Sequence, residues 1–111
     1  MKSEVYFTKE ITEENLVKIF EKLEKDLPGK VAVKVHSGEQ GNQNYLKPEF
    51  LKQIIEKVNG TVVETNTAYE GERNTSEKHK KLLENHNWTK YYNVDILDEE
   101  DSDIKLDKPN G

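Results

Sequence analysis

Cysteine is missing from all 111 residues of the chain. Disulfide bonds and thiolate-held iron–sulfur clusters both need cysteine sulfur, so this segment can form neither with its own side chains. Apolar residues make up only 32% of the sequence and charged residues 35%, and no apolar run approaches the roughly 20 residues that span a bilayer. We therefore expect one small domain, without a membrane segment, whose core depends on a few well-patterned stretches.

The sequence also lacks an apolar leader and a basic surface. Charged residues from Lys9 onward interrupt the start of the chain, so we expect no secretory signal and predict a cytoplasmic protein. The formal net charge is −5, and the acidic excess begins at Asp95, after which the remainder of the chain has few lysines. The part before Asp95 is close to neutral, which argues against binding to nucleic acid or to a membrane surface. We expect a monomer whose partner is a small molecule.

Apolar residues at helical spacing predict two amphipathic helices. The first follows the N-cap Thr12, continues for about four turns and stops at Pro28, while the second begins near Pro48. A third helix is expected after Thr75 or Ser76. The apolar positions are Leu16, Ile19, Phe20, Leu23 and Leu27 in the first helix, and Leu51, Ile54, Ile55 and Val58 in the second.

Four short stretches with strand composition alternate with these helices. They are Glu4–Thr8, Val31–Val35, Thr61–Thr65 and Trp88–Val94. The second is apolar at all positions but Lys34, which is typical of a strand buried on both faces in the middle of a parallel sheet. The βαβαβαβ order predicts an α/β fold, a three-layer Rossmann-like domain with a mostly parallel sheet.

The domain is expected to cover residues 1–94. The acids, the proline and the final glycine of residues 95–111 predict a disordered, flexible acidic tail, with a short strand near Ile96. More strands would be expected after the fourth one in a fold of this kind. We therefore interpret the chain as the N-terminal portion of a longer protein.

Polar loops follow the second and third predicted strands. Carboxyl ends of parallel strands meet at one edge of a sheet, so both loops should face a common space, where open α/β proteins bind ligands. The alternative is that both loops are merely solvated. The candidate ligand-binding residues are Lys34, His36, Glu39, Asn42 and Tyr45 from the first loop region, and Asn66, Thr67, Tyr69, Arg73 and His79 from the second loop and the following helix.

An anion is one ligand that suits these residue types. Lys34 and Arg73 supply positive charge, and Gly38 and Gly41 allow backbone N–H groups to approach a phosphate or a carboxylate. The loop lacks both glycine-rich nucleotide fingerprints, so a nucleotide is only weakly indicated. Tyr45 can stack on a flat ligand or pack beneath its loop, and both interpretations stay open.

A metal ion is the second possibility. His36, Glu39 and His79 provide nitrogen and oxygen donors of the kind that zinc or iron accepts. His79 also shares a helical stripe with two leucines, so it can equally border the core. No set of nucleophile, base and orienting residue follows from the spacing. We therefore assign no metal ligand and no catalytic residue from the sequence.

Two motifs make the loops recognisable. They are Val31–Asn42 followed by Tyr45–Phe50, and Thr65–Arg73 followed by His79. In this order they resemble the start of the domain-of-unknown-function 362 family, whose members are often described as uncharacterised iron–sulfur-centre proteins. The resemblance runs from about Val5 to Asn87.

This resemblance implies an α/β domain at the N-terminus of a chain several times longer. In many members the later part carries cysteine clusters for 4Fe–4S centres, so such a cofactor is expected only in a C-terminal part that is missing here. We predict that the domain binds an anionic or metal-containing small ligand at the loops after the second and third strands. The alternatives are part of a redox enzyme completed by that missing region, and an interaction module that uses the acidic tail.

Overall fold

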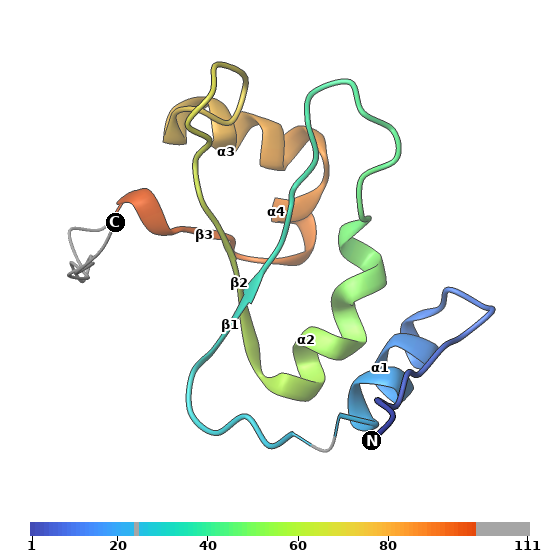
Figure 1. Cartoon of the computed structure of the whole chain (residues 1–111). Helices are drawn as coiled ribbons and strands as arrows, with labels where there is room; N and C mark the ends of the chain where they lie inside the picture. The colour runs from blue at the N-terminus through green and yellow to red at the C-terminus, as the bar shows by residue number, and fades with distance from the viewer. Residues whose placement is uncertain (24, 100–111) are drawn as a thin grey trace.

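The computed structural model of the chain describes residues 1–23 and 25–99. Its elements are α1 (Glu13–Glu21), β1 (Val31–Lys34), the 3-10 helix η1 (Pro48–Leu51), α2 (Lys52–Val58), β2 (Gly60–Glu64), α3 (Ser76–Asn85), α4 (Trp88–Tyr91), β3 (Asp95–Ile96) and the 3-10 helix η2 (Leu97–Glu99). The strands form a parallel sheet in the order β1-β2-β3 (Figure 1). The α/β class and the parallel sheet are therefore confirmed.

The core lies on one face of the sheet. On this face Val35, Val62 and Ile96 pack with buried residues of the helical layer, namely Leu51, Ile55, Leu83 and Trp88. On the opposite face the paired residues Ala32 and Thr61 are exposed. The described residues thus form two layers, and the three-layer Rossmann-like arrangement predicted from the sequence is not seen in them.

β1 lies at the edge of the described sheet, with β2 between β1 and β3. Burial alternates along β1, where Val31 and Val33 are half-buried while Ala32 and Lys34 are exposed. The central position predicted from its apolar composition was wrong. Helices of the described part cover only one face of this strand, and Ala32 and Lys34 on its other face are exposed.

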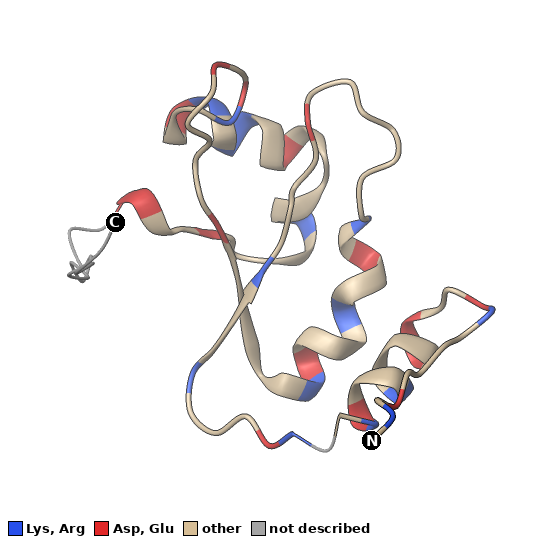
Figure 2. Cartoon of the chain, in the orientation of Figure 1, with Lys and Arg blue, Asp and Glu red and all other residues tan. Residues whose placement is uncertain are grey.

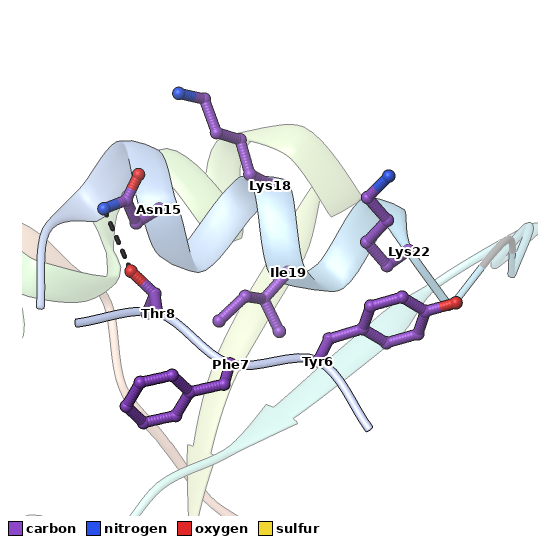
Figure 3. Close-up of a pocket in the computed structure, with 7 residues that line it drawn as sticks. All are labelled: Tyr6, Phe7, Thr8, Asn15, Lys18, Ile19 and Lys22. Atoms are coloured by element: carbon purple, nitrogen blue, oxygen red, sulfur yellow. Dashed lines mark hydrogen bonds between the residues drawn. The ribbon is translucent and has the colours of Figure 1, made fainter. Parts of the chain in front are cut away.

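The N-terminal segment lies along α1 and is not part of the sheet (Figure 1). Glu4–Thr8, expected as the first strand, has no strand partner in the described chain and instead runs along α1, where Asn15 Nδ2 donates to Thr8 Oγ1 at 3.1 Å (Figure 3). Phe7 remains 81% exposed. A strand needs a neighbouring strand for its backbone hydrogen bonds, so β-rich composition alone was insufficient.

α1 packs against α2, to which the ion pair Lys57–Glu21 joins it at 2.8 Å (Figure 1). Its predicted N-cap is confirmed, because Thr12 Oγ1 accepts from the backbone N–H of Asn15 at 3.1 Å. The helix is shorter than the predicted four turns, and Leu23 stays 54% exposed beyond its end. Helical stability in proteins comes mainly from packing of the apolar face, so the unburied end of the stripe does not extend the helix.

Trp88–Val94 was predicted as a strand, but its first part is the short helix α4. Asn87, with φ of 63°, adopts a left-handed conformation just before it. Trp88 is fully buried, and its indole Nε1 donates to the carbonyl of Ser37 at 3.0 Å. Tertiary packing of the aromatic side chains therefore overrides their strand preference here.

The start of the expected tail belongs to the fold. β3 and η2 lie within residues 95–111, and the β3 residue Ile96 is buried in the core. The short strand expected near Ile96 is thus confirmed. Residues 100–111, which make up most of the expected disordered tail, lie outside the described residues.

Charges of both signs are spread over the molecule. Figure 2 shows basic and acidic positions interspersed along α1, α2 and α3. Within residues 1–23 and 25–99, no helix has the length and apolar character needed to cross a membrane.

Candidate functional site

A buried carboxylate lies at the carboxyl end of β2. The Glu64 side chain is 1% exposed, and its Oε2 accepts from Ser37 Oγ at 2.7 Å and from Ser37 N at 3.1 Å. Arg73 NH1 donates to the same oxygen at 3.2 Å, and Lys34 Nζ donates to Oε1. A buried charge is tolerated when cations and hydrogen bonds compensate it, as they do here. Glu64 therefore joins the loops after β1 and β2 into one charged cluster.

The hydrogen bonds keep Glu64 ionised. Burial alone would raise the pKa of Glu64, but the hydrogen bonds from His79, Lys34 and Ser37 outweigh burial and hold this pKa far below its ordinary value of 4.5. Glu64 is therefore an anion throughout the neutral range.

The stability of the fold should decrease as the pH falls below the ordinary pKa of glutamate. The pKa of Glu64 is lower in the folded than in the unfolded chain, so the unfolded state takes up its proton at higher pH and gains stability. The hydrogen bond from Tyr69 likewise lowers the pKa of Glu39; partial burial opposes this, and the charge of Arg73 lowers the pKa further. We expect urea midpoints to fall from about pH 5 downward. Glu64→Gln should flatten this slope, and a wild-type midpoint that stays constant down to about pH 3 would contradict the expectation.

A chain of hydrogen bonds runs from Ser37 to α3. Ser37 Oγ lies 3.1 Å from His79 Nε2, and His79 Nδ1 lies 3.0 Å from Asn66 Oδ1. The order resembles that of a nucleophile, a base and an orienting residue. However, Ser37 is 0% exposed and its hydroxyl donates to Glu64, so that proton is not directed at His79. These side chains position the loop and are not arranged for nucleophilic attack.

Two aromatic residues fix the backbone of Ser37 from another direction. Its carbonyl accepts from Trp88 Nε1 at 3.0 Å and lies 2.9 Å from His86 Nδ1. The imidazole of His86 stacks on Tyr45, with ring centroids 4.1 Å apart. Tyr45 therefore packs beneath its loop, which was one of the two interpretations left open by the sequence.

An exposed rim lies next to this buried cluster. Glu39 Oε1 is 2.9 Å from Arg73 NH2 and accepts from Tyr69 OH at 2.5 Å. The side chains of Glu39 and His36 are 40% and 63% exposed, and His36 Nε2 is 4.0 Å from Glu39 Oε1. Arg73 is only 5% exposed and also bonds to Glu64. The guanidinium thus links the solvent-accessible rim to the buried carboxylate.

Most of the candidate residues chosen from the sequence come together here. Asn42 and Thr67 do not, because Asn42 Oδ1 accepts from a backbone N–H in an exposed turn at 2.9 Å, and Thr67 Oγ1 donates to the carbonyl of Tyr69 at 3.0 Å. Tyr45 also lies outside the charged cluster. The candidates that the structure brings together are Lys34, His36, Glu39, Asn66, Tyr69, Arg73 and His79.

Four residues of the cluster and its support were not among those candidates: Ser37, Glu64, His86 and Trp88. A signal for Glu64 was available. It ends an apolar strand in the same way as Lys34 does, so opposite charges stand at the carboxyl ends of neighbouring strands. His86 and Trp88 approach the loop from a distant part of the chain, and no local pattern indicates that.

The metal alternative finds little support in this arrangement. The ring nitrogens of His79 face Ser37 and Asn66, so His79 does not join His36 and Glu39 as a third ligand. Across the described part of the chain, no three His, Cys, Asp or Glu side chains are grouped to hold a metal ion.

Comparison with family models places both loops within one match. A model described as "Domain of unknown function (DUF362)" matches residues 31–110. This range begins with β1, whereas the resemblance seen in the sequence was placed from about Val5 to Asn87. Neither the curated proteins nor the solved structures contain a match to the chain.

Proposed function

We propose that this chain, which belongs to the family described as Domain of unknown function (DUF362), binds a small anionic ligand at the rim between the loops after β1 and β2. The family description gives no activity, so the proposal depends on the geometry of the chain itself. The observation that carries it is the hydrogen bonding of one guanidinium group.

Arg73 is a buried cation with an unused donor. NH1 bonds to Glu64, and NH2 bonds to Glu39 and to Tyr69 OH, the latter at 3.1 Å. Nε is buried and has no hydrogen-bond partner within the described residues. A buried donor without an acceptor costs about 1–3 kcal/mol, so an arginine with a purely structural role is not expected to keep one.

The unused donor lies on an edge suited to an anion. Nε and NH2 form one side of the guanidinium fork, to which carboxylates and phosphates bind through two parallel hydrogen bonds. Lys34 adds a second cation nearby, because its half-exposed side chain also reaches Glu64. Together these groups favour a small anion over a neutral or cationic ligand.

We expect Arg73→Lys to weaken anion binding by about tenfold or more. Lysine keeps the charge but cannot form the two parallel hydrogen bonds, and one charge-assisted hydrogen bond contributes about 1.5–3 kcal/mol. The measurement is a titration of the labelled 111-residue chain with acetate and with inorganic phosphate, followed by amide NMR shifts.

The affected amides should lie in residues 37–42 and 66–73. Lys81→Gln, which removes an exposed cation from α3, controls for non-specific attraction and should leave the affinity unchanged. The proposal fails if neither anion moves these amides at millimolar concentrations, or if Arg73→Lys binds as well as the wild type while remaining folded.

A further inference from the structure

The side chain of Glu39 already occupies the position at Arg73 that an anion would take. Its carboxylate lies 2.9 Å from NH2 and receives the Tyr69 hydroxyl proton at 2.5 Å. Two carboxylates of the described residues bond to Arg73: Glu39, which is exposed, and Glu64, which is enclosed. The Glu39 carboxylate from the first loop therefore occupies the anion position at Arg73 and Tyr69 of the second loop.

We infer that the ligand carries a carboxylate that replaces the Glu39 carboxylate at Arg73 and Tyr69. This inference rests on the proposed anion-binding function and narrows it to one chemical class. The incoming carboxylate would accept from NH2 and from the Tyr69 hydroxyl, as Glu39 does, and its second oxygen would satisfy the unused Nε. The exchange thus gains one hydrogen bond for Arg73.

Charge balance favours a carboxylate over a phosphate. Lys34 and Arg73 offset Glu64 and Glu39, so replacing Glu39 by one carboxylate leaves the balance unchanged. A phosphate group carries about −1.5 to −2 at neutral pH, and it would bring this larger charge next to Glu64, which lies 3.2 Å from the same guanidinium. A like charge placed close to a carboxylate disfavours its ionised form.

The backbone around Glu39 allows the exchange. Gly38 and Gly41, with φ of 95° and 78°, flank it in conformations that glycine adopts readily. The Glu39 side chain is 40% exposed, and its polar partners within the described residues are Arg73, Tyr69 and His36. Ser37, directly before this segment, is fixed at its amide, hydroxyl and carbonyl groups. Glu39 can therefore swing away from Arg73 while the base of the site stays in place.

The test compares Glu39→Gln with Glu70→Gln in the 111-residue chain. Removing the internal competitor should tighten acetate binding by about 3- to 10-fold, because the apparent affinity rises as the fraction of open sites rises. Glu70 is exposed on the second loop, and its replacement removes the same charge without freeing Arg73, so its effect should be much smaller. In the wild type, acetate should bind more tightly than inorganic phosphate.

A second measurement follows Glu39 directly. With carboxyl-13C-labelled glutamate, saturating acetate should move the Glu39 carboxyl resonance toward that of exposed glutamates and leave the Glu64 resonance nearly unchanged. The inference is overturned if phosphate binds more tightly than acetate, or if Glu39→Gln binds acetate no better than Glu70→Gln. Such a result, combined with loss of binding in Arg73→Lys, would leave the anion site intact and reject only the exchange. Absence of binding in every variant would reject both.

Discussion

Replacing Glu64 by glutamine should lower the free energy of unfolding by about 3–5 kcal/mol. The substitution keeps the shape of the side chain but removes the negative charge that faces Arg73 and Lys34. Lys34 is half-exposed and can turn to water, whereas the Arg73 guanidinium is 5% exposed and would remain buried without a full counter-charge. Breaking a buried pair from one side is costly for this reason.

Urea unfolding at neutral pH measures this loss. Glu84→Gln, on the exposed side of α3, should change stability by no more than about 0.5 kcal/mol. Combining Glu64→Gln with Arg73→Met should recover part of the loss, since the buried cation is removed as well, with a coupling of about 1–3 kcal/mol. A loss below about 1 kcal/mol in the single variant, which is typical of exposed ion pairs, would show that the cluster is open to water.

Gly38→Ala should destabilise the fold by about 3 kcal/mol or more. Its φ of 95° lies in the region that costs other residues roughly 1–2 kcal/mol. A Cβ at this position would also lie 2.6 Å from Cβ and Cγ of Tyr45 and 3.0 Å from Nδ1 of His86. Side chains forced into a packed region add about 1–3 kcal/mol.

Gly41→Ala separates these two causes. Gly41 has a φ of 78°, but a Cβ there would meet nothing within 4 Å. It should therefore cost only the backbone contribution of about 1–2 kcal/mol. Equal unfolding free energies for Gly38→Ala and Gly41→Ala in urea would mean that Tyr45 and His86 can move aside, and that their stack does not hold the loop.

The parts of the fold that depend on local chemistry were predictable. Thr12 and Thr75 cap their helices through hydroxyl groups that accept a backbone N–H three residues later, and such caps are visible in sequence. Pro48 begins η1 in the position where a missing N–H costs nothing. The starts of β1 and β2 likewise follow from their flanking residues.

The parts that depend on distant partners were not predictable. Glu4–Thr8 and Trp88–Val94 both have strand composition, yet one finds no strand partner in the described chain and the other is drawn into the core through Trp88. The number of layers in the fold depends on whether helices cover one face of the sheet or both. An apolar run such as Val31–Val35 does not specify which of the two occurs.

The candidate site was likewise predictable only in part. Loops that follow neighbouring parallel strands lie at one edge of the sheet, and Glu39, Tyr69 and Arg73 from these loops do lie in contact. Glu64 was not among the candidates, although it ends β2 as Lys34 ends β1. The iron–sulfur cofactor, the redox alternative and the cytoplasmic location stay predictions, because none of the contacts described above bears on them.

Trp88 gives the loop a native fluorophore. The chain contains one tryptophan, and its indole N–H bonds directly to the carbonyl of Ser37. Emission from an indole depends on its hydrogen bonding and on the water near it, so any rearrangement that reaches Ser37 changes a signal with a single source. A rearrangement limited to the Glu39 side chain and the exposed rim would not change this emission. The emission of this protein therefore distinguishes motion of the rim from motion of its base without an attached label.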